Sequence, residues 1–295
     1  RTRRRPADSA PTVPLRGAAA AEPPQPRLPP WQPHEAADTA LPTPSSVEGR
    51  VASLAFDPAG CRTMQLVLQD ARVDVAARLA GELRGHVRAA VESPHANHVL
   101  QLVVQLLPAE LRDFVSEELL GMGAAAARHR YGCRVVCRLL EHQPSGSAPR
   151  SAPAARALAE EVVAALPRLV RHEFGRHVAS TVIEHGTDEH RAQLARILLE
   201  NVLGNALNRN GSYIVEQAID CCRGEDRDAI VRQLLDRPEG LVPLARSQAG
   251  CHVIRAMARP AVGRRDAVLA HLRRLFWEIE VSKYGVALLR ELGLP

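Results

Sequence analysis

Flat and polar side chains recur at nearly constant steps along this chain of 295 residues, each time directly after a small residue. The small residues are Gly60, Ala96, Gly132, Gly175, Gly211, Gly250 and Gly285, with separations of 36, 36, 43, 36, 39 and 35 residues. Counted from the residue that follows, position two is Arg, His or Tyr in six segments: Arg62, His98, Arg134, His177, Tyr213 and His252. Planar groups at such regular steps are suited to stacking between successive bases of a single nucleic-acid strand.

Positions one and five of each segment form a pair of side chains that could contact the edge of a base. The pairs are Cys61 with Gln65, Asn97 with Gln101, Cys133 with Cys137, Arg176 with Ser180, Ser212 with Glu216, and Cys251 with Arg255. Most of them offer hydrogen-bond donors and acceptors of the kind that base edges require. The seventh segment offers Val286, Ala287 and Arg290 and neither stacks nor hydrogen-bonds well. Since the chain ends at Pro295 before a third helix, we expect it to be a cap or a truncated repeat.

A helix must position these residues, because apolar side chains occupy positions three, four, seven and eight. The second segment shows this with Val99, Leu100, Val103 and Val104, and only Thr63 interrupts the pattern in the first. At 100° per residue these positions form one arc of a helix, with positions one and five beside it and position two on the far flank. The pattern predicts that positions one, two and five are all exposed.

The rest of the chain from residue 47 shows the same helical spacing, and no segment alternates like a strand. A period near 36 residues with one insertion, at residues 144–153, predicts an all-α repeat protein. Residues 1–46 hold half of the 22 prolines and are predicted to be a disordered tail, so the repeat domain is 47–295. The chain begins at Arg1 without an initiator Met, which predicts a processed or incomplete copy.

Charge, cysteine content and hydropathy narrow the function further. The net charge is +5, and every cation except Lys283 is Arg, which is compatible with a nucleic-acid partner without establishing one. The six cysteines form no C-x-x-C pair and are expected to be reduced thiols. No apolar run reaches eighteen residues, so we expect no membrane segment and a cytoplasmic location.

Neither a cofactor nor an enzyme is predicted. His129, Cys133, Cys137 and His142 could approach one another, but a structural zinc site needs four well-spaced ligands, and no metal is expected. The sequence contains no Gly-rich phosphate loop and no nucleophile elbow. The recurrence of histidine at position two fits stacking better than the single base of an active site.

In the segments GCRTMQ, ANHVLQ, GSYIVE and GCHVIR, the sequence resembles the Pumilio (PUF) family of RNA-binding repeat proteins, over residues 47–295. The resemblance implies a curved right-handed α-solenoid of about seven three-helix repeats. Its concave face would bind single-stranded RNA, one base per repeat, with the N-terminal repeat at the 3′ end.

The family's base code can be carried over to individual pairs. Cys61 with Gln65 resembles the adenine pair, Asn97 with Gln101 the uracil pair and Ser212 with Glu216 the guanine pair. Cys251 with Arg255 is similar to the cytosine pair. The third repeat departs from the pattern because a thiol stands where Gln would hold adenine, and the fourth matches no base. The predicted target is 5′-C-G-N-(A/N)-U-A-3′.

The resemblance therefore implies a monomeric protein that binds the 3′ untranslated regions of messenger RNAs and controls their translation or stability. Protein partners would bind the convex face or the tail. Two alternatives remain: a Pumilio-like factor of ribosome biogenesis, nucleolar and with little base preference, or a HEAT- or armadillo-like solenoid that binds proteins.

Overall fold

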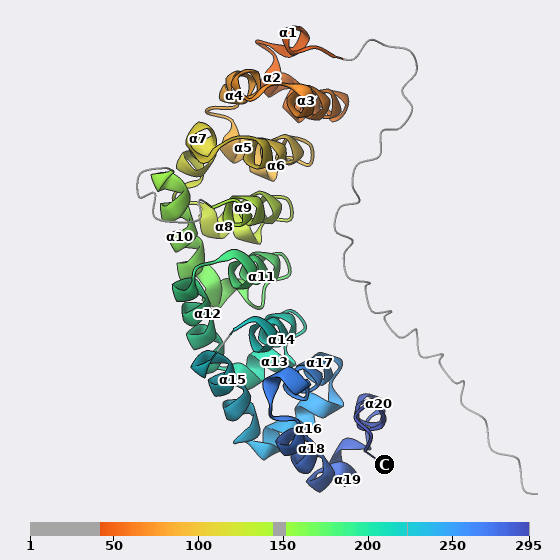
Figure 1. Cartoon of the computed structure of the whole chain (residues 1–295). Coiled ribbons are helices and arrows are strands. Elements are labelled where there is room, and N and C mark those ends of the chain that lie inside the picture. Colours follow the sequence, from red (N-terminus) through yellow and green to blue (C-terminus); the bar gives the residue numbers. More distant parts are fainter. Residues whose placement is uncertain (1–41, 144–151, 223, 295) are drawn as a thin grey trace, which may run out of the picture. The chain divides into compact units, whose positions relative to one another are not determined.

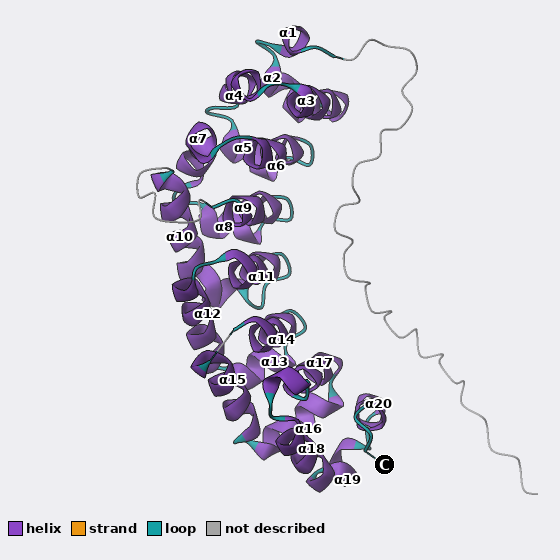
Figure 2. Cartoon of the chain, viewed as in Figure 1, coloured by secondary structure: helices purple, strands orange, loops and turns teal. Residues whose placement is uncertain are grey.

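The computed structural model describes residues 42–143, 152–222 and 224–294, all of which belong to one compact unit, Pro42–Pro295. Every regular element in these ranges is a helix (Figure 2). The predicted tail up to Leu41 and most of the predicted insertion, residues 144–151, lie outside the described residues. The first helix, α1 (Pro44–Val47), begins three residues before the predicted boundary at 47, and Val47 is buried.

Three sets of helices make up the described unit. We call them inner, outer and connecting helices by their place in Figure 1. The inner helices are α3 (Pro58–Asp70), α6 (Ala96–Leu106), α9 (Gly132–Glu141), α11 (Gly175–His185), α14 (Gly211–Cys221), α17 (Gln248–Met257) and α20 (Lys283–Glu291). The outer helices are α4 (Val73–Gly81), α7 (Ala109–Leu119), α10 (Pro153–Leu169), α12 (Asp188–Glu200), α15 (Glu225–Leu235) and α18 (Arg265–Arg274).

The connecting helices are short and precede the inner ones. They are α2 (Val51–Phe56), α5 (Val87–Glu92), α8 (Gly123–Arg128), α13 (Val202–Leu207), α16 (Pro238–Arg246) and α19 (Phe276–Ile279), and a 3₁₀ turn, η1 (Pro260–Val262), follows α17. Consecutive inner helices pack against one another along the whole row. Figure 1 shows the row bending toward the side on which the inner helices lie. The predicted curved α-solenoid is confirmed.

The core is formed by the positions that the sequence pattern assigned to it. Positions three, four, seven and eight of the five middle inner helices are buried without exception, and in α3 the exception is the partly exposed Thr63. The side chains are Val, Leu, Ile, Ala and Met, so thin apolar layers between neighbouring helices replace a core of large aromatics. No helix among the described residues is long and apolar enough to cross a bilayer.

A side chain three residues before each small anchor caps each inner helix. Its oxygen or ring nitrogen accepts a hydrogen bond from the anchor's backbone N–H, at 2.6 to 3.2 Å. The capping residues are Asp57, Ser93, His129, His172, Asn208, Ser247 and Ser282. Because a capped first turn satisfies otherwise unpaired N–H groups, the start of every inner helix is fixed in register.

Carboxylates close individual repeats in the N-terminal half. Glu82, Glu118 and Glu161, at or near the outer helices, each accept two backbone N–H groups at the start of the connecting helix of the same repeat, α2, α5 and α8 respectively. Each carboxylate lies where the helix dipole favours negative charge. These contacts hold the connecting helix of each of these repeats against the outer helix of the same repeat.

The anchor glycines allow each inner helix to approach the backbone of its connecting helix. A Cβ built on Gly211 would lie 2.6 Å from the carbonyl oxygen of Asn205, and one on Gly250 would lie 2.4 Å from that of Leu244. Backbone cannot move aside cheaply, so a side chain here forces the helices apart.

We therefore expect Gly211→Ala to lower the free energy of unfolding by about 1–3 kcal/mol, as overpacking does in close-packed interiors. Gly81→Ala is the matched control, because Gly81 lies in α4, where an added Cβ would have no heavy atom within 4 Å, and the change should gain about 0.5–1 kcal/mol. Urea denaturation of both variants tests this. Equal shifts in the two midpoints would contradict the close approach.

Candidate nucleic-acid interface

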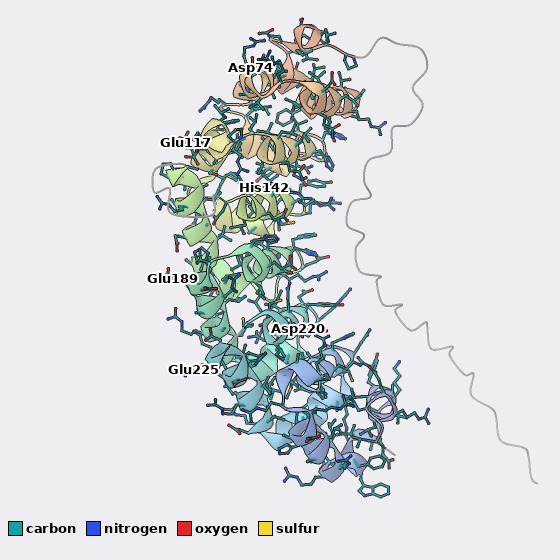
Figure 3. The ribbon with its side chains drawn as sticks, viewed as in Figure 1. Asp74, Glu117, His142, Glu189, Asp220 and Glu225 are labelled. Carbon is teal, nitrogen blue, oxygen red and sulfur yellow. The ribbon has the colours of Figure 1, made fainter. Side chains whose placement is uncertain are left out.

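The position-two side chains form one row along the inner helices. Arg62 and Arg134 are exposed, Tyr213 is 47% exposed, and His98, His177 and His252 are partly buried. Figure 3 shows side chains projecting from the inner helices along the full height of the stack. Position two is therefore exposed, as predicted, in the first, third and fifth repeats and partly exposed in the second, fourth and sixth.

Two consecutive members of this row, Tyr213 and His252, lie close enough to interact. Their rings are stacked, with centroids 6.3 Å apart and planes 30° from parallel. The guanidinium of Arg176, at position one of the preceding repeat, lies 5.1 Å from the centre of the Tyr213 ring. A base inserted between two rings needs about 7 Å, twice the 3.4 Å spacing of stacked bases. A small separation of α14 and α17 would therefore admit one base.

Two histidines of the row, His98 and His177, have a lowered pKa, which favours the neutral ring. Burial, followed by the nearby cations of Arg176 and Arg134, lowers the pKa of His177 to about 4. Burial and Arg134 likewise lower the pKa of His98. Arg134 thus lies within electrostatic reach of the preceding and the following position-two ring, and both rings are uncharged planar surfaces.

Position one is buried in five of the six repeats, and only Arg176 is partly exposed, so the prediction that position one is exposed was wrong. Asn97 is 0% exposed, Ser212 2%, and Cys61, Cys133 and Cys251 are each 3% exposed. The cause is the neighbouring repeat: the thiol of Cys61 lies 3.2 Å from the carbonyl oxygen of His95, and that of Cys251 lies 3.7 Å from that of Tyr284. Cys61 and Cys251 thus lie at the seam between two consecutive inner helices.

In each of the first two repeats, the two residues of the base-edge pair are hydrogen-bonded to each other within one helix. Gln65 donates from Nε2 to the sulfur of Cys61 at 3.1 Å. Gln101 donates from Nε2 to Oδ1 of Asn97 at 2.9 Å, and Gln101 is only 6% exposed. A base must therefore replace or share hydrogen bonds that already exist here.

The pairs of the third and fourth repeats differ from the others. Cys137 is partly buried, and burial raises its pKa to about 12, so it is a neutral thiol. Ser180 donates to Oε1 of Gln217 in the next repeat at 2.6 Å. The Nε–H of Arg176 has no hydrogen-bond partner among the described residues. Neither pair offers an arrangement that selects one base.

In the fifth and sixth repeats, the base-edge residues are charged and paired with the following repeat. Glu216 accepts from Nη2 of Arg259 at 2.7 Å, and Arg255 contacts Glu291 at 2.8 Å. Glu216 keeps 22% of its side chain exposed. Arg259, Gln217 and Glu291 were not predicted from the sequence, and they belong to positions six and nine rather than to the triplets.

The residues considered for a metal do not form a site. Nδ1 of His129 accepts backbone N–H groups of Tyr131 and Gly132, at 3.3 and 3.2 Å, which is its role as a helix cap. No cluster of three potential ligands occurs among the described residues.

Comparisons with known proteins agree with this geometry. Residues 50–83, 93–120, 127–145, 169–199 and 206–235 match the model of a family described as a Pumilio-family RNA-binding repeat. A Pumilio domain-containing protein of Schizosaccharomyces pombe is 22% identical over 245 residues, 82% of this chain and 35% of that protein. A pumilio homologue of Arabidopsis thaliana is 26% identical over 167 residues, 56% of this chain and 30% of that protein. The chain thus spans about a third of the length of these relatives.

Solved structures share the fold. The Puf3 RNA-binding domain bound to the Cox17 RNA 3′ UTR recognition sequence superposes with a TM-score of 0.74 at 20% identity, covering 84% of this chain and 75% of that one. PUF-8 in complex with PBE-RNA gives a TM-score of 0.76 at 20% identity, covering 84% and 72%.

Proposed function

The chain belongs to the Pumilio (PUF) family of repeat proteins, and on this premise we propose that it binds single-stranded RNA in a sequence-specific manner. The family is one of RNA-binding proteins and not of enzymes. The single observation that carries the proposal is the row of planar side chains at position two of six consecutive inner helices. Two neighbours with this fold were solved with recognition RNAs, which supports the same ligand class here.

The charges of the face favour reading of bases over binding by charge alone. The chain has a net charge of only +5, and Glu216, an acid, lies among the base-edge residues. An ionised carboxylate can accept two donors from the Watson–Crick edge of guanine, but it repels phosphate. We therefore propose the target 5′-C-G-N-(A/N)-U-A-3′, read from the sixth repeat to the first.

The biological role follows as a further part of the proposal. We propose that the protein binds messenger RNA 3′ untranslated regions in the cytoplasm as a monomer and regulates translation or stability through protein partners. The structures with 3′ UTR recognition sequences support the class of target.

One observation favours the family's low-specificity branch as a second candidate. The uracil pair of Asn97 and Gln101 is buried and satisfied within its own helix, and the third and fourth repeats select no base. If the first four repeats all bind their bases with little preference, only the fifth and sixth repeats, at the guanine and cytosine positions, would distinguish one base from another.

Fluorescence anisotropy separates the two candidates. The RNAs are a labelled hexamer of the proposed sequence, CGUAUA, its single-base variants and a scrambled hexamer of the same composition. Sequence-specific binding predicts a loss of about tenfold or more for a change at the guanine position, from about 1–3 kcal/mol per bidentate contact. Equal affinity for the scrambled hexamer would overturn it in favour of the second candidate.

A further inference from the structure

The position-five residues of the fourth, fifth and sixth repeats contact the following repeat, unlike those of the first two repeats. Ser180 bonds to Gln217, Glu216 to Arg259 and Arg255 to Glu291, each pair bridging two successive inner segments. Gln65 and Gln101 bond instead to residues of their own helices. In three repeats, therefore, the next repeat determines where the base-edge group points.

The contact to Glu216 is the most constrained of the three. Arg259 follows α17 and reaches back with both arms of its guanidinium: Nη2 donates to Oε1 of Glu216 at 2.7 Å, and Nη1 donates to Oδ2 of Asp220. The hydrogen bonds that Arg259 donates to Asp220 and Glu216 raise its pKa, which favours the cation. Figure 3 labels Asp220 at the level of α14, whereas Glu117, Glu189 and Glu225 come from outer helices.

Arg259 approaches Glu216 from a direction that leaves the carboxylate able to accept hydrogen bonds from a base. Ser212 lies one helical turn before Glu216 and Asp220 one turn after it, and Arg259 approaches on the Asp220 side. Oε2 of Glu216 has no hydrogen bond with any part of the chain that the structure describes. A carboxylate has about four acceptor sites, so one contact on Oε1 leaves both oxygens able to accept.

Without Arg259, the two acids would be mutually repulsive. Glu216 and Asp220 are four residues apart on one helix face, where like charges destabilise each other. The planar fork of arginine can bridge two carboxylates, which the single ammonium of lysine cannot do in the same geometry.

Resting on the proposed function, we propose that Arg259 is a positioning residue for guanine recognition, which holds the Glu216 carboxylate beside Ser212 from the neighbouring repeat. The guanine site of this chain then consists of three residues on two repeats: Ser212 and Glu216 of the fifth and Arg259 of the sixth. Its selectivity depends on a side chain outside the base-reading triplets.

The test compares Arg259→Ala in two backgrounds by anisotropy, with hexamers carrying each base at the second position. In the otherwise unchanged protein, we expect affinity for the guanine hexamer to fall about five- to twentyfold, as for loss of a hydrogen bond to a charged group, while the other three change less than about twofold. In the Ser212→Asn, Glu216→Gln protein, which has no carboxylate to hold, the same change should leave the affinity for the uracil hexamer within about twofold. Arg259→Lys should restore part of the guanine selectivity.

Arg78→Ala is the matched control. Arg78, in the outer helix of the first repeat, pairs with Glu48 at the end of α1 at 3.1 Å, away from the position-two row, and its loss should leave RNA affinity unchanged. If Arg259→Ala does not fold, Arg259→Lys carries the comparison alone, with a loss of guanine selectivity smaller than for Ala but still measurable.

Three results would overturn the inference. Higher guanine affinity in Arg259→Ala would mean that Arg259 competes with the base, equal losses in both backgrounds would mean a structural role, and unchanged selectivity would mean no role. A wild-type protein that does not distinguish guanine at this position would instead overturn the proposed function itself, and the inference with it.

Discussion

Replacing Ser212 by Asn and Glu216 by Gln should change the preference at the second base of the RNA from guanine to uracil. Glutamine substitutes a donor and an acceptor for two acceptors, so the donor edge of guanine loses its partner and the mixed edge of uracil gains one. Each good bidentate pair is worth about 1–3 kcal/mol of discrimination, so the preference should reverse by roughly tenfold or more. Anisotropy with hexamers differing only at that base measures it.

The fifth repeat is suited to this pair of substitutions because Glu216 is partly exposed. The reciprocal change, Asn97→Ser with Gln101→Glu, would place a carboxylate at a position that is 6% exposed and should destabilise the fold. Ser212→Asn alone is the matched control and should not favour uracil. An unchanged preference in the double variant would show that the fifth repeat does not read this base.

Tyr213→Ala should weaken binding of all RNAs together, by about five- to a hundredfold, because stacking on an aromatic ring is worth about 1–3 kcal/mol per base and does not depend on which base is bound. The ring of Tyr213 stacks with that of His252 and is also contacted by the guanidinium of Arg176, at position one of the preceding repeat, so its loss removes the only stacked pair of rings among the position-two residues that the structure describes. The ratio of affinities for the guanine hexamer and its variants should stay within about twofold of the wild-type ratio.

Trp277→Ala tests whether such a loss is specific to the row. Trp277 is 78% exposed on α19 and is not at position two of any repeat, so its removal should leave RNA affinity unchanged. If Tyr213→Ala bound as tightly as wild type, or if Trp277→Ala lost as much, stacking at position two would not be the source of affinity.

The fold could be predicted from the sequence because its repeat pattern is local. A helix face with apolar residues at positions three, four, seven and eight fixes which side of each inner helix is buried, and this was confirmed on every inner helix from α6 to α17. Position two, opposite to that face, was also placed correctly. The spacing of apolar residues within a single helix determines both the buried face and the place of position two.

What sequence reasoning missed depends on neighbouring helices. Asn97 and Ser212 lie beside the apolar arc, and a single helix leaves such positions half open; the next inner helix closes over them. The capping residues were missed because Asp, Ser, Asn and His share the role, so no single residue type marks that position in all repeats.

A signal for Arg259 was present in the repeat alignment. Position nine is an acid in three successive repeats, Glu141, Glu184 and Asp220, and then reverses its charge at Arg259. Comparing charges between neighbouring repeats, instead of residue types within the triplets, would have indicated an ion pair across the seam. The geometry of its two arms could come only from the structure.

In-vitro selection of bound sequences from a random RNA pool tests the central claim most directly. One base per repeat, read from the sixth repeat to the first, predicts enrichment of C-G-N-(A/N)-U-A, with the guanine most strongly selected. Two results together would contradict the claim that this row of residues reads bases: recovery of RNA with no enriched sequence, and an affinity for that RNA that falls as salt is raised, as expected for binding by charge alone.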